Sequence, residues 1–235
     1  MAMRLDLSRL KQVGRAAAIL LLLGLTAQTD SSEPFGLVTV AAPEGPLWTT
    51  WRRLQAEIKA EQPVIAQCRA KPQSCRSPAA RQFIAIVDEG APFQGLARIG
   101  HINRAANLAI RAINDATPSE LHSKWTSPLA TLAAGAGDCK QYAVLKYAAL
   151  QDGGFAAEDV RIVIVGQRTQ PGTHAVVAVR NEGHWLILDS RSLAIVEASA
   201  VLDRYVPLDD FDQRGVREFV NQPQVAQESG AACAS

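Results

Sequence analysis

The segment that follows Gly137 constrains the fold more than any other part of the chain. Its apolar residues recur at helical spacing until residues 152–154, where an aspartate and two glycines end the pattern. A buried helix is therefore predicted, with Cys139 in its first turn. There the helix dipole and the unpaired backbone N–H groups stabilise a thiolate and offer donors to an oxyanion. A cysteine at this position also suits a small buried site without any chemistry.

Two downstream segments carry the side chains that a cysteine nucleophile needs. Residues 173–179 have the pattern of a strand with His174 near its start, and residues 184–189 have that of the next strand, which ends on Asp189. Adjacent antiparallel strands can bring a base and the carboxylate that orients it side by side. The sequence thus predicts a catalytic triad of Cys139, His174 and Asp189.

Helical patterns occupy the first half of the chain and strand patterns the second half. Helices are expected at residues 47–58, 78–89 and 93–116, the first of them ending by Pro63. Strands are expected at residues 160–165, 174–180 and 184–189, with shorter ones at 37–40, 192–196 and 205–208. The three longer strands would form an antiparallel meander. This order predicts an α+β fold in which helices pack on an antiparallel sheet.

The three motifs, in this order and at these intervals, resemble the bacterial transglutaminase-like cysteine peptidases. The resemblance runs from about residue 103 to residue 212 and implies a papain/transglutaminase-like fold. It also implies that Cys139 attacks a carbonyl, that His174 carries the proton and that Asp189 orients the imidazole. The best-known members are periplasmic proteases that release biofilm adhesins from the outer membrane. The resemblance therefore implies a protein substrate, an outer-membrane adhesin among the candidates, and an inner-membrane receptor as regulator.

The resemblance assigns further residues to the surroundings of the triad. Asn103, Asn107 and Asn114 match an asparagine-bearing helix that packs on the catalytic core in the family. Trp125 lies where members usually carry a tryptophan, and it would either cover the nucleophile and hold substrate or fill the core. Asp138 is a second candidate for the substrate and oxyanion region.

The residues after the nucleophile depart from the family pattern. Members typically read Gly-Asp-Cys-Glu-Asp, and those acids take part in binding a calcium ion that activity requires. Here the two positions hold Lys140 and Gln141. Calcium prefers about six to eight oxygen ligands, so an ammonium and an amide leave a degenerate site at Asp138, Lys140 and Gln141. We expect no metal and no other cofactor, with Lys140 supplying the positive charge by pairing with Asp138 or a nearby acid.

The start of the chain has the pattern of a secretory signal peptide. Basic residues precede an apolar run at 16–25, and small residues near Ala27 offer a cleavage point. The run is shorter than the roughly 20 residues of a membrane span, and an uncleaved anchor is the alternative. The expected organisation is a signal peptide (1–27), a linker (28–46), a peptidase domain (47–220) and a disordered tail (221–235). The expected location is the periplasm.

The four cysteines differ in context. Cys68 and Cys75 flank a polar, proline-bearing loop, and an oxidising compartment favours a disulfide between them. Cys139 is the candidate nucleophile. Cys233 lies in the tail, where it is expected to be an unpaired thiol.

Composition narrows the classes of function. The net charge is +1, and the sequence has no basic stripe with aromatic residues, no phosphate-binding loop and no zinc-ligand spacing, so a nucleic-acid partner is not expected. Nothing in the sequence demands more than a monomer. Two alternatives to a peptidase are an acyl transferase or amidase with the same triad, and a non-catalytic binding module in which Lys140 marks lost chemistry. The intact triad argues against the binding module, and the family resemblance favours hydrolysis over acyl transfer.

Overall fold

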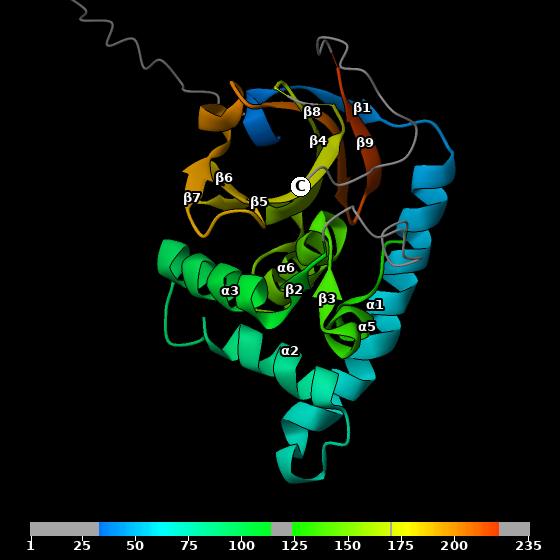
Figure 1. The fold of residues 1–235 in the computed structure, drawn as a ribbon, viewed down its shortest axis with the longest axis vertical. Coiled ribbons are helices and arrows are strands. Elements are labelled where there is room, and N and C mark those ends of the chain that lie inside the picture. Colours follow the sequence, from blue (N-terminus) through cyan, green and yellow to red (C-terminus); the bar gives the residue numbers. More distant parts are fainter. Residues whose placement is uncertain (1–32, 114–123, 170, 221–235) are drawn as a thin grey trace, which may run out of the picture.

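A seven-stranded antiparallel sheet forms one layer of the fold, and helices pack against it to form the other (Figure 1). The computed structural model describes residues 33–113, 124–169 and 171–220. The helices are α1 (Pro46–Ala70), α2 (Pro78–Asp88), α3 (Gly95–Ala109), α5 (Pro128–Ala134) and α6 (Cys139–Asp152), with short 3-10 helices η1 (Pro34–Gly36), η2 (Pro72–Ser74), η3 (Ala157–Asp159) and η4 (Ala198–Val201). The expected α+β fold is confirmed.

The strands of the main sheet run in the order β1-β9-β8-β4-β5-β6-β7. Their bounds are β1 (Thr39–Ala41), β4 (Val160–Gln167), β5 (Thr173–Asn181), β6 (His184–Leu188), β7 (Ile195–Glu197), β8 (Tyr205–Asp212) and β9 (Gly215–Phe219). The expected meander is β4, β5 and β6, and β4 is central, as its apolar sequence predicts. Alternate residues of β4 face opposite sides: Ile162 and Ile164 pack toward the helices, whereas Val163 and Val165 pack in a second core beneath η1 and η4.

Helix α6 lies at the centre of the helical layer. Every residue from Cys139 to Leu150 is buried, since β4 and β5 cover one side and α2, α3 and α5 cover the others. A helix buried on all sides needs no polar stripe, which explains its nearly continuous apolar pattern. This burial holds the first turn of α6 in a fixed position against the sheet.

The end predicted for the first helix is wrong. Helix α1 does not end by Pro63 but continues to Ala70. Proline removes one helical hydrogen bond, yet Ile65 and Cys68 beyond it are buried in the core. Tertiary packing therefore keeps the helix going past a residue that usually interrupts one.

The helix expected at 93–116 is also shorter than predicted. Helix α3 ends at Ala109, and the chain then forms β2 (Arg111–Ala112), which pairs in parallel with β3 (Ala136–Gly137). This small sheet ties the end of α3 to the residues just before the nucleophile. Residues 114–123 lie outside the described part of the chain.

The N-terminal segment joins the sheet. Residues 39–41 form β1, which overlaps the short strand expected at 37–40 within the linker. Strand β1 pairs with β9, and the sequence pattern did not predict β9. Trp51 of α1 is 1% exposed, and its indole N–H donates to the Asp212 carbonyl at 2.7 Å, so it is a core residue. Its ring packs edge-on against Tyr147 and Phe211.

The disulfide between Cys68 and Cys75 is present and connects the end of α1 to the residue after η2. Within the described residues, no helix is both long and apolar enough to cross a membrane. The expected signal peptide and tail lie outside these residues.

Candidate active site

The turn before α6 places Cys139 as its first residue. The Asp138 carboxylate accepts from the Lys140 backbone N–H at 2.9 Å, and the Gln141 side chain accepts from the Asp138 N–H at 2.9 Å, which completes a capping box. A Cβ on Gly137 would lie 2.5 Å from the Cβ of Gln141. Only glycine therefore fits before the cap, and the Gly-Asp-Cys order has a local structural cause.

The structure brings the three predicted triad residues to one region. The His174 Nε2 lies 2.8 Å from Asp189 Oδ1, and the backbone N–H of Ala175, the next residue of β5, donates to Cys139 Sγ at 3.2 Å. His174 is 2% exposed. Among the described residues its Nδ1 has no hydrogen-bond partner, so this nitrogen is the one left to exchange a proton with Cys139.

Cys139 is 6% exposed and lies in the first turn of α6. Only a thiolate attacks a carbonyl. The reduced form of Cys139 is therefore the one in which the surrounding geometry can support catalysis.

Asp189 is held by several donors. Burial alone would raise the pKa of Asp189, but the hydrogen bond and charge of His174 and the bonds from Arg191 and Tyr205 outweigh it and keep this pKa well below its ordinary value. The Tyr205 hydroxyl donates to Oδ2 at 2.6 Å, and the Arg191 backbone N–H donates to Oδ1 at 2.9 Å. Asp189 is thus an ionised carboxylate in a fixed orientation.

Helix α3 supports the segment that follows Asp189. The Asn107 amide donates to the Asp189 and Ser192 carbonyls at 3.4 and 3.3 Å, and the buried Asn103 amide donates to the Leu193 carbonyl at 3.5 Å. These are two of the asparagines that the resemblance singled out. The third, Asn114, lies outside the described residues.

Lys140 and Asp138 form a buried ion pair beside the nucleophile. The Lys140 Nζ lies 2.8 Å from Asp138 Oδ2, and both side chains are 2% exposed. The Gln141 amide donates to the Lys124 carbonyl at 2.6 Å. An ammonium directly on the one remaining carboxylate does not fit a calcium ion, which would be repelled by it. Within residues 33–113, 124–169 and 171–220, no group of three or more His, Cys, Asp or Glu side chains is arranged to hold a metal.

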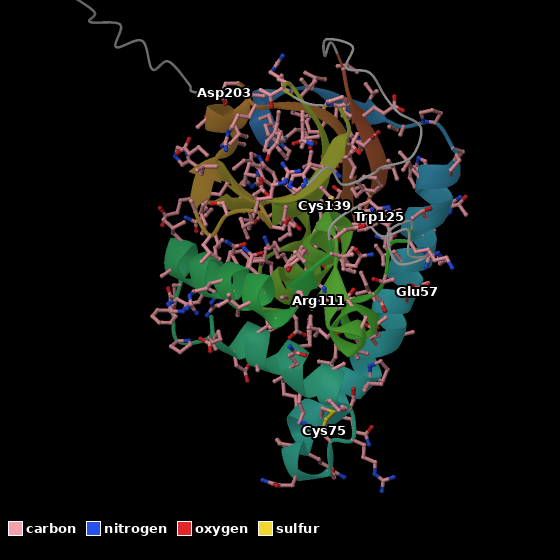
Figure 2. The ribbon with its side chains drawn as sticks, viewed as in Figure 1. Glu57, Cys75, Arg111, Trp125, Cys139 and Asp203 are labelled. Carbon is pink, nitrogen blue, oxygen red and sulfur yellow. A yellow bond between two sulfur atoms is a disulfide. The ribbon has the colours of Figure 1, made fainter. Side chains whose placement is uncertain are left out.

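Trp125 is 6% exposed, and its ring lies 5.5 Å from that of Phe211. Its carbonyl accepts from Arg53 of α1 at 3.0 Å. The residue thus packs in the core that joins α1 and the sheet; Figure 2 labels it together with Cys139.

Two residues near Asp189 were not assigned from the sequence. Tyr205 was expected only as the start of a strand, and Lys146 was read only as part of the buried helix. Lys146 is 1% exposed, and its burial lowers its pKa to about 7, although Asp189 partly opposes this. The sequence feature that could have identified Lys146 is its position within the apolar run of α6, seven residues after Cys139.

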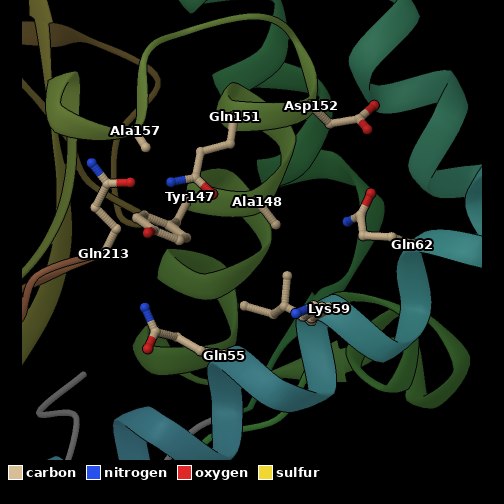
Figure 3. A pocket seen from close by; sticks show the side chains of 10 residues that line it. Gln55, Lys59, Gln62, Tyr147, Ala148, Gln151, Asp152, Ala157 and Gln213 are labelled. Atoms are coloured by element: carbon tan, nitrogen blue, oxygen red, sulfur yellow. The ribbon is translucent and has the colours of Figure 1, made fainter.

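A polar groove elsewhere is separate from this site. It lies between α1 and the C-terminal half of α6, where Gln55 and Gln62 face Tyr147 and Gln151 (Figure 3). Cys139 is at the other end of α6. The groove therefore does not supply the substrate site of the nucleophile.

The chain was compared with known families and structures. The model of the bacterial transglutaminase-like cysteine proteinases matches residues 57–218. The calcium-bound LapG of Legionella pneumophila is 22% identical with a TM-score of 0.56, over 72% of this chain and 94% of that one. The EGTA-treated LapG of the same organism is 23% identical with a TM-score of 0.56, over 67% and 86% of the two chains. No curated protein sequence gives a match. At these identities the solved structures support the fold alone.

Proposed function

The chain belongs to the bacterial transglutaminase-like cysteine proteinases, and we propose that it hydrolyses a peptide bond in a secreted or outer-membrane protein through Cys139, His174 and Asp189. The observation that carries this proposal is the contact of His174 with Asp189 on a strand whose next residue, Ala175, contacts the Cys139 sulfur.

The geometry supports a mechanism with reduced Cys139. Transfer of the thiol proton to His174 Nδ1 forms a thiolate and imidazolium pair, which Asp189 stabilises from Nε2. The thiolate attacks the carbonyl carbon, and backbone N–H groups at the start of α6 donate to the oxyanion. His174 then delivers its proton to the leaving amine, and water hydrolyses the acyl-enzyme.

The test is the pH dependence of alkylation of Cys139 in the reduced protein, with Cys139→Ala to subtract other thiols. A free thiol titrates at a pH of about 8.5, whereas a thiolate held by an imidazolium reacts from well below pH 7. We expect the low-pH reaction, and we expect His174→Ala to abolish it. An ordinary thiol profile in the wild type would overturn the triad.

The same preparation tests whether water or an amine accepts the acyl group from Cys139. Extracytoplasmic proteins incubated with the reduced wild-type enzyme should gain new N-termini that are absent with Cys139→Ala. Incorporation of an added primary amine without new N-termini would instead identify an acyl transferase.

We propose that activity does not depend on calcium. Support comes from the Lys140 ammonium, which lies on the Asp138 carboxylate and brings to this position the positive charge that a cation would carry. The Legionella LapG has been solved both with calcium and after EGTA treatment, so the two proteins invite direct comparison. Alkylation of Cys139 should be unchanged by EGTA, and calorimetric titration should show no binding. Micromolar calcium binding would overturn this proposal.

A periplasmic location, an adhesin as substrate and control by an inner-membrane receptor complete the proposal. The location is supported by the signal-peptide pattern of residues 1–27 and by the Cys68–Cys75 disulfide, which suits an oxidising compartment. The adhesin and the receptor are supported by the family resemblance alone. N-terminal sequencing of the protein from the extracytoplasmic fraction should show cleavage near Ala27. A protein that stays in the membrane fraction with its first 27 residues intact would contradict the cleaved signal.

A further inference from the structure

Three exposed arginines lie around the Asp189 end of the candidate triad. Arg191 is the second residue after Asp189, Arg168 follows the last residue of β4, and Arg204 precedes the first residue of β8. The Arg168 backbone N–H donates to the Arg204 carbonyl at 2.9 Å, and the Arg191 backbone N–H donates to the Asp189 carboxylate. The backbone therefore fixes the three residues next to one another and next to the triad. We call them the basic rim.

Two of the rim guanidiniums are held by hydrogen bonds that keep the charge at the surface. Arg191 Nη1 donates at 2.8 Å to the side-chain oxygen of Gln167, a buried residue, and Arg168 Nε donates to the Leu202 carbonyl at 2.8 Å. A side chain that is already oriented loses less conformational entropy when it binds a ligand. These two arginines are therefore ordered in advance of binding.

Tyr205 connects the third rim residue to the candidate base. The centre of its ring lies 6.1 Å from that of His174, and the Arg204 guanidinium carbon lies 5.7 Å from the same ring. Arg204 Nε also lies 3.8 Å from the exposed Asp203 carboxylate. Water screens an exposed pair of this kind, so a ligand carboxylate can replace it at little cost. One aromatic ring thus separates the rim from His174.

We propose that the basic rim binds carboxylates of the protein substrate on the C-terminal side of the bond that is cut. The guanidinium group is planar and always charged, and it binds a carboxylate through two parallel hydrogen bonds. Three such groups at one edge match a segment with more than one Asp or Glu side chain. The inference rests on the proposed function and names a sequence preference of the same site.

The side of the substrate follows from the direction of proton transfer. In the proposed mechanism His174 gives its proton to the leaving amine, so the residues after the cut bond pass His174. The rim lies beyond His174 from Cys139, because it contacts the triad through Asp189 and Tyr205. An extended chain advances about 3.5 Å per residue, so the rim is within reach of roughly the second to fifth residues after the cut.

The first test measures how well an acidic peptide protects Cys139 of the full mature chain from iodoacetamide, a neutral reagent. The probes are capped pentaglutamate and capped pentalysine, and the reaction is followed by mass spectrometry of the Cys139 peptide after reduction. At low ionic strength we expect pentaglutamate to slow alkylation by about three-fold or more, and pentalysine to have no effect. The protection should disappear near about 1 M salt, where the screening length falls to about 3 Å.

Replacement of all three rim arginines by glutamine (Arg168→Gln, Arg191→Gln, Arg204→Gln) should abolish the protection by pentaglutamate. Each protein is compared with its own alkylation rate without peptide, so a change in the reactivity of Cys139 itself does not enter. The reaction is run at pH 9, where an ordinary thiol is also largely ionised, and the result therefore does not depend on the triad chemistry.

The matched control removes three positive charges elsewhere. Lys71→Gln, Arg76→Gln, Arg81→Gln changes exposed residues around Cys75, which lies at the end of the molecule away from Cys139 (Figure 2). This variant should retain the protection. Equal protection of the two triple variants would overturn the rim, as would equal effects of pentaglutamate and pentalysine on the wild type.

The second test determines the sequences at which the protein cuts. Among the new N-termini that the reduced wild type produces in extracytoplasmic proteins, Asp and Glu should be enriched at positions two to five. For peptides copied from these sites, the triple rim variant should lower kcat/KM by about ten-fold or more. It should have little effect once the acids of the peptide are replaced by Asn and Gln.

The two tests separate this inference from the proposed function. Protection by pentaglutamate together with new N-termini that lack acidic residues would show that the rim binds acids outside the substrate, and would overturn the inference. No new N-termini at all would contradict the proposed peptidase. The protection test would still decide whether the rim binds carboxylates.

Discussion

The Asp138–Lys140 pair is a buried charge pair in direct contact with the catalytic turn. Taking two charges out of water is costly, and their mutual attraction offsets that cost only while both are present. Asp138 also caps α6 through the Lys140 N–H, so the same carboxylate holds both the helix and the ammonium. Loss of the ammonium leaves a buried negative charge beside a sulfur that must itself become negative.

Replacement of Lys140 by methionine should therefore lower the free energy of unfolding by about 3 to 5 kcal/mol. The double variant Asp138→Asn, Lys140→Met should lose less than the sum of the two single variants, because the pair is then removed as a unit. Urea unfolding of the four proteins of this cycle measures the coupling. If the losses of the two single variants add up to the loss of the double variant, the 2.8 Å contact between Lys140 and Asp138 contributes nothing to the free energy of unfolding.

Tyr205 is a positioning residue rather than a catalytic one, since it acts through Asp189. Tyr205→Phe removes one of three donors to the carboxylate and weakens the support of the imidazolium. A hydrogen bond to a charged group contributes about 1.5 to 3 kcal/mol, so alkylation of reduced Cys139 at pH 6 should slow by roughly ten-fold or more.

The matched control for Tyr205→Phe is Tyr142→Phe, whose hydroxyl donates to the Ile110 carbonyl at 2.8 Å away from Asp189. It should lower stability without changing the pH at which Cys139 becomes reactive. If both variants shift that pH alike, the effect of Tyr205 is structural.

The sequence predicts the three residues of the candidate triad but not the residues that hold Asp189 in place. Cys139, His174 and Asp189 could be placed because helix starts and strand ends have local signals. Tyr205 comes from β8, which is next to β4 in the sheet order, and nothing local to its sequence indicates that it reaches Asp189. Contacts of this kind depend on strand order, which is a property of the whole sheet.

The elements that were predicted well are those whose hydrophobic pattern and boundaries agree. The pattern of α6 ends at glycines, and β4 to β6 are short, mainly apolar and buried runs separated by turns. Helix α1 was ended too early because a local rule for proline was outweighed by core packing after Pro63. Strand β9 was missed because it is five residues long and carries Arg217 and Glu218, so its pairing with β1 and β8 decides its conformation.

The start of α6 depends on the absence of a side chain at residue 137. Gly137→Ala would place a Cβ 2.5 Å from the Gln141 Cβ, which the helix holds in place, so the capping box must shift. Overpacking of this kind costs about 1 to 3 kcal/mol, and the displaced Cys139 should lose its low-pH reactivity. Thermal unfolding and the alkylation profile measure both effects.

Gly100→Ala is the control for this substitution. A Cβ there meets only Ile195 at 3.7 Å, an ordinary contact, and the residue lies inside α3. The change should stabilise the protein by about 0.5 to 1 kcal/mol and leave Cys139 unaffected. If both substitutions destabilise the protein to the same degree, the crowding of a Cβ at residue 137 against Gln141 does not explain the loss.

At the scale of the whole molecule, catalysis depends on the junction between the helical layer and the sheet. Helix α6 carries the proposed nucleophile and β5 the proposed base, while β8 holds the Asp189 carboxylate and α3 holds the Asp189 backbone carbonyl. The rigidity of this junction depends on how well α6 is packed. Helix α6 also contains Lys146, a buried lysine whose Nζ has no hydrogen-bond partner among the described residues. Lys146 therefore influences the stability of the whole protein.

Lys146 should make global stability depend on pH in a defined direction. Burial lowers the pKa of Lys146 in the folded protein to about 7, from 10.5 in the unfolded chain. Between these values the unfolded state binds a proton that the folded state does not, so the free energy of unfolding rises with pH by about 1.4 kcal/mol per unit. Below pH 7 the full cost of burying the ammonium is present, and above 10.5 it is gone.

Lys146→Met keeps the shape of the side chain and removes this cost. The variant should be more stable than the wild type by several kcal/mol at pH 6, and the difference should shrink steadily as the pH rises to 10. Urea unfolding at pH 6, 8 and 10 measures it, with the exposed Lys59→Met as a control that should change stability little at any pH. A difference between Lys146→Met and the wild type that stays constant over this range would mean that Lys146 remains charged in the fold, held by Asp189 across the junction.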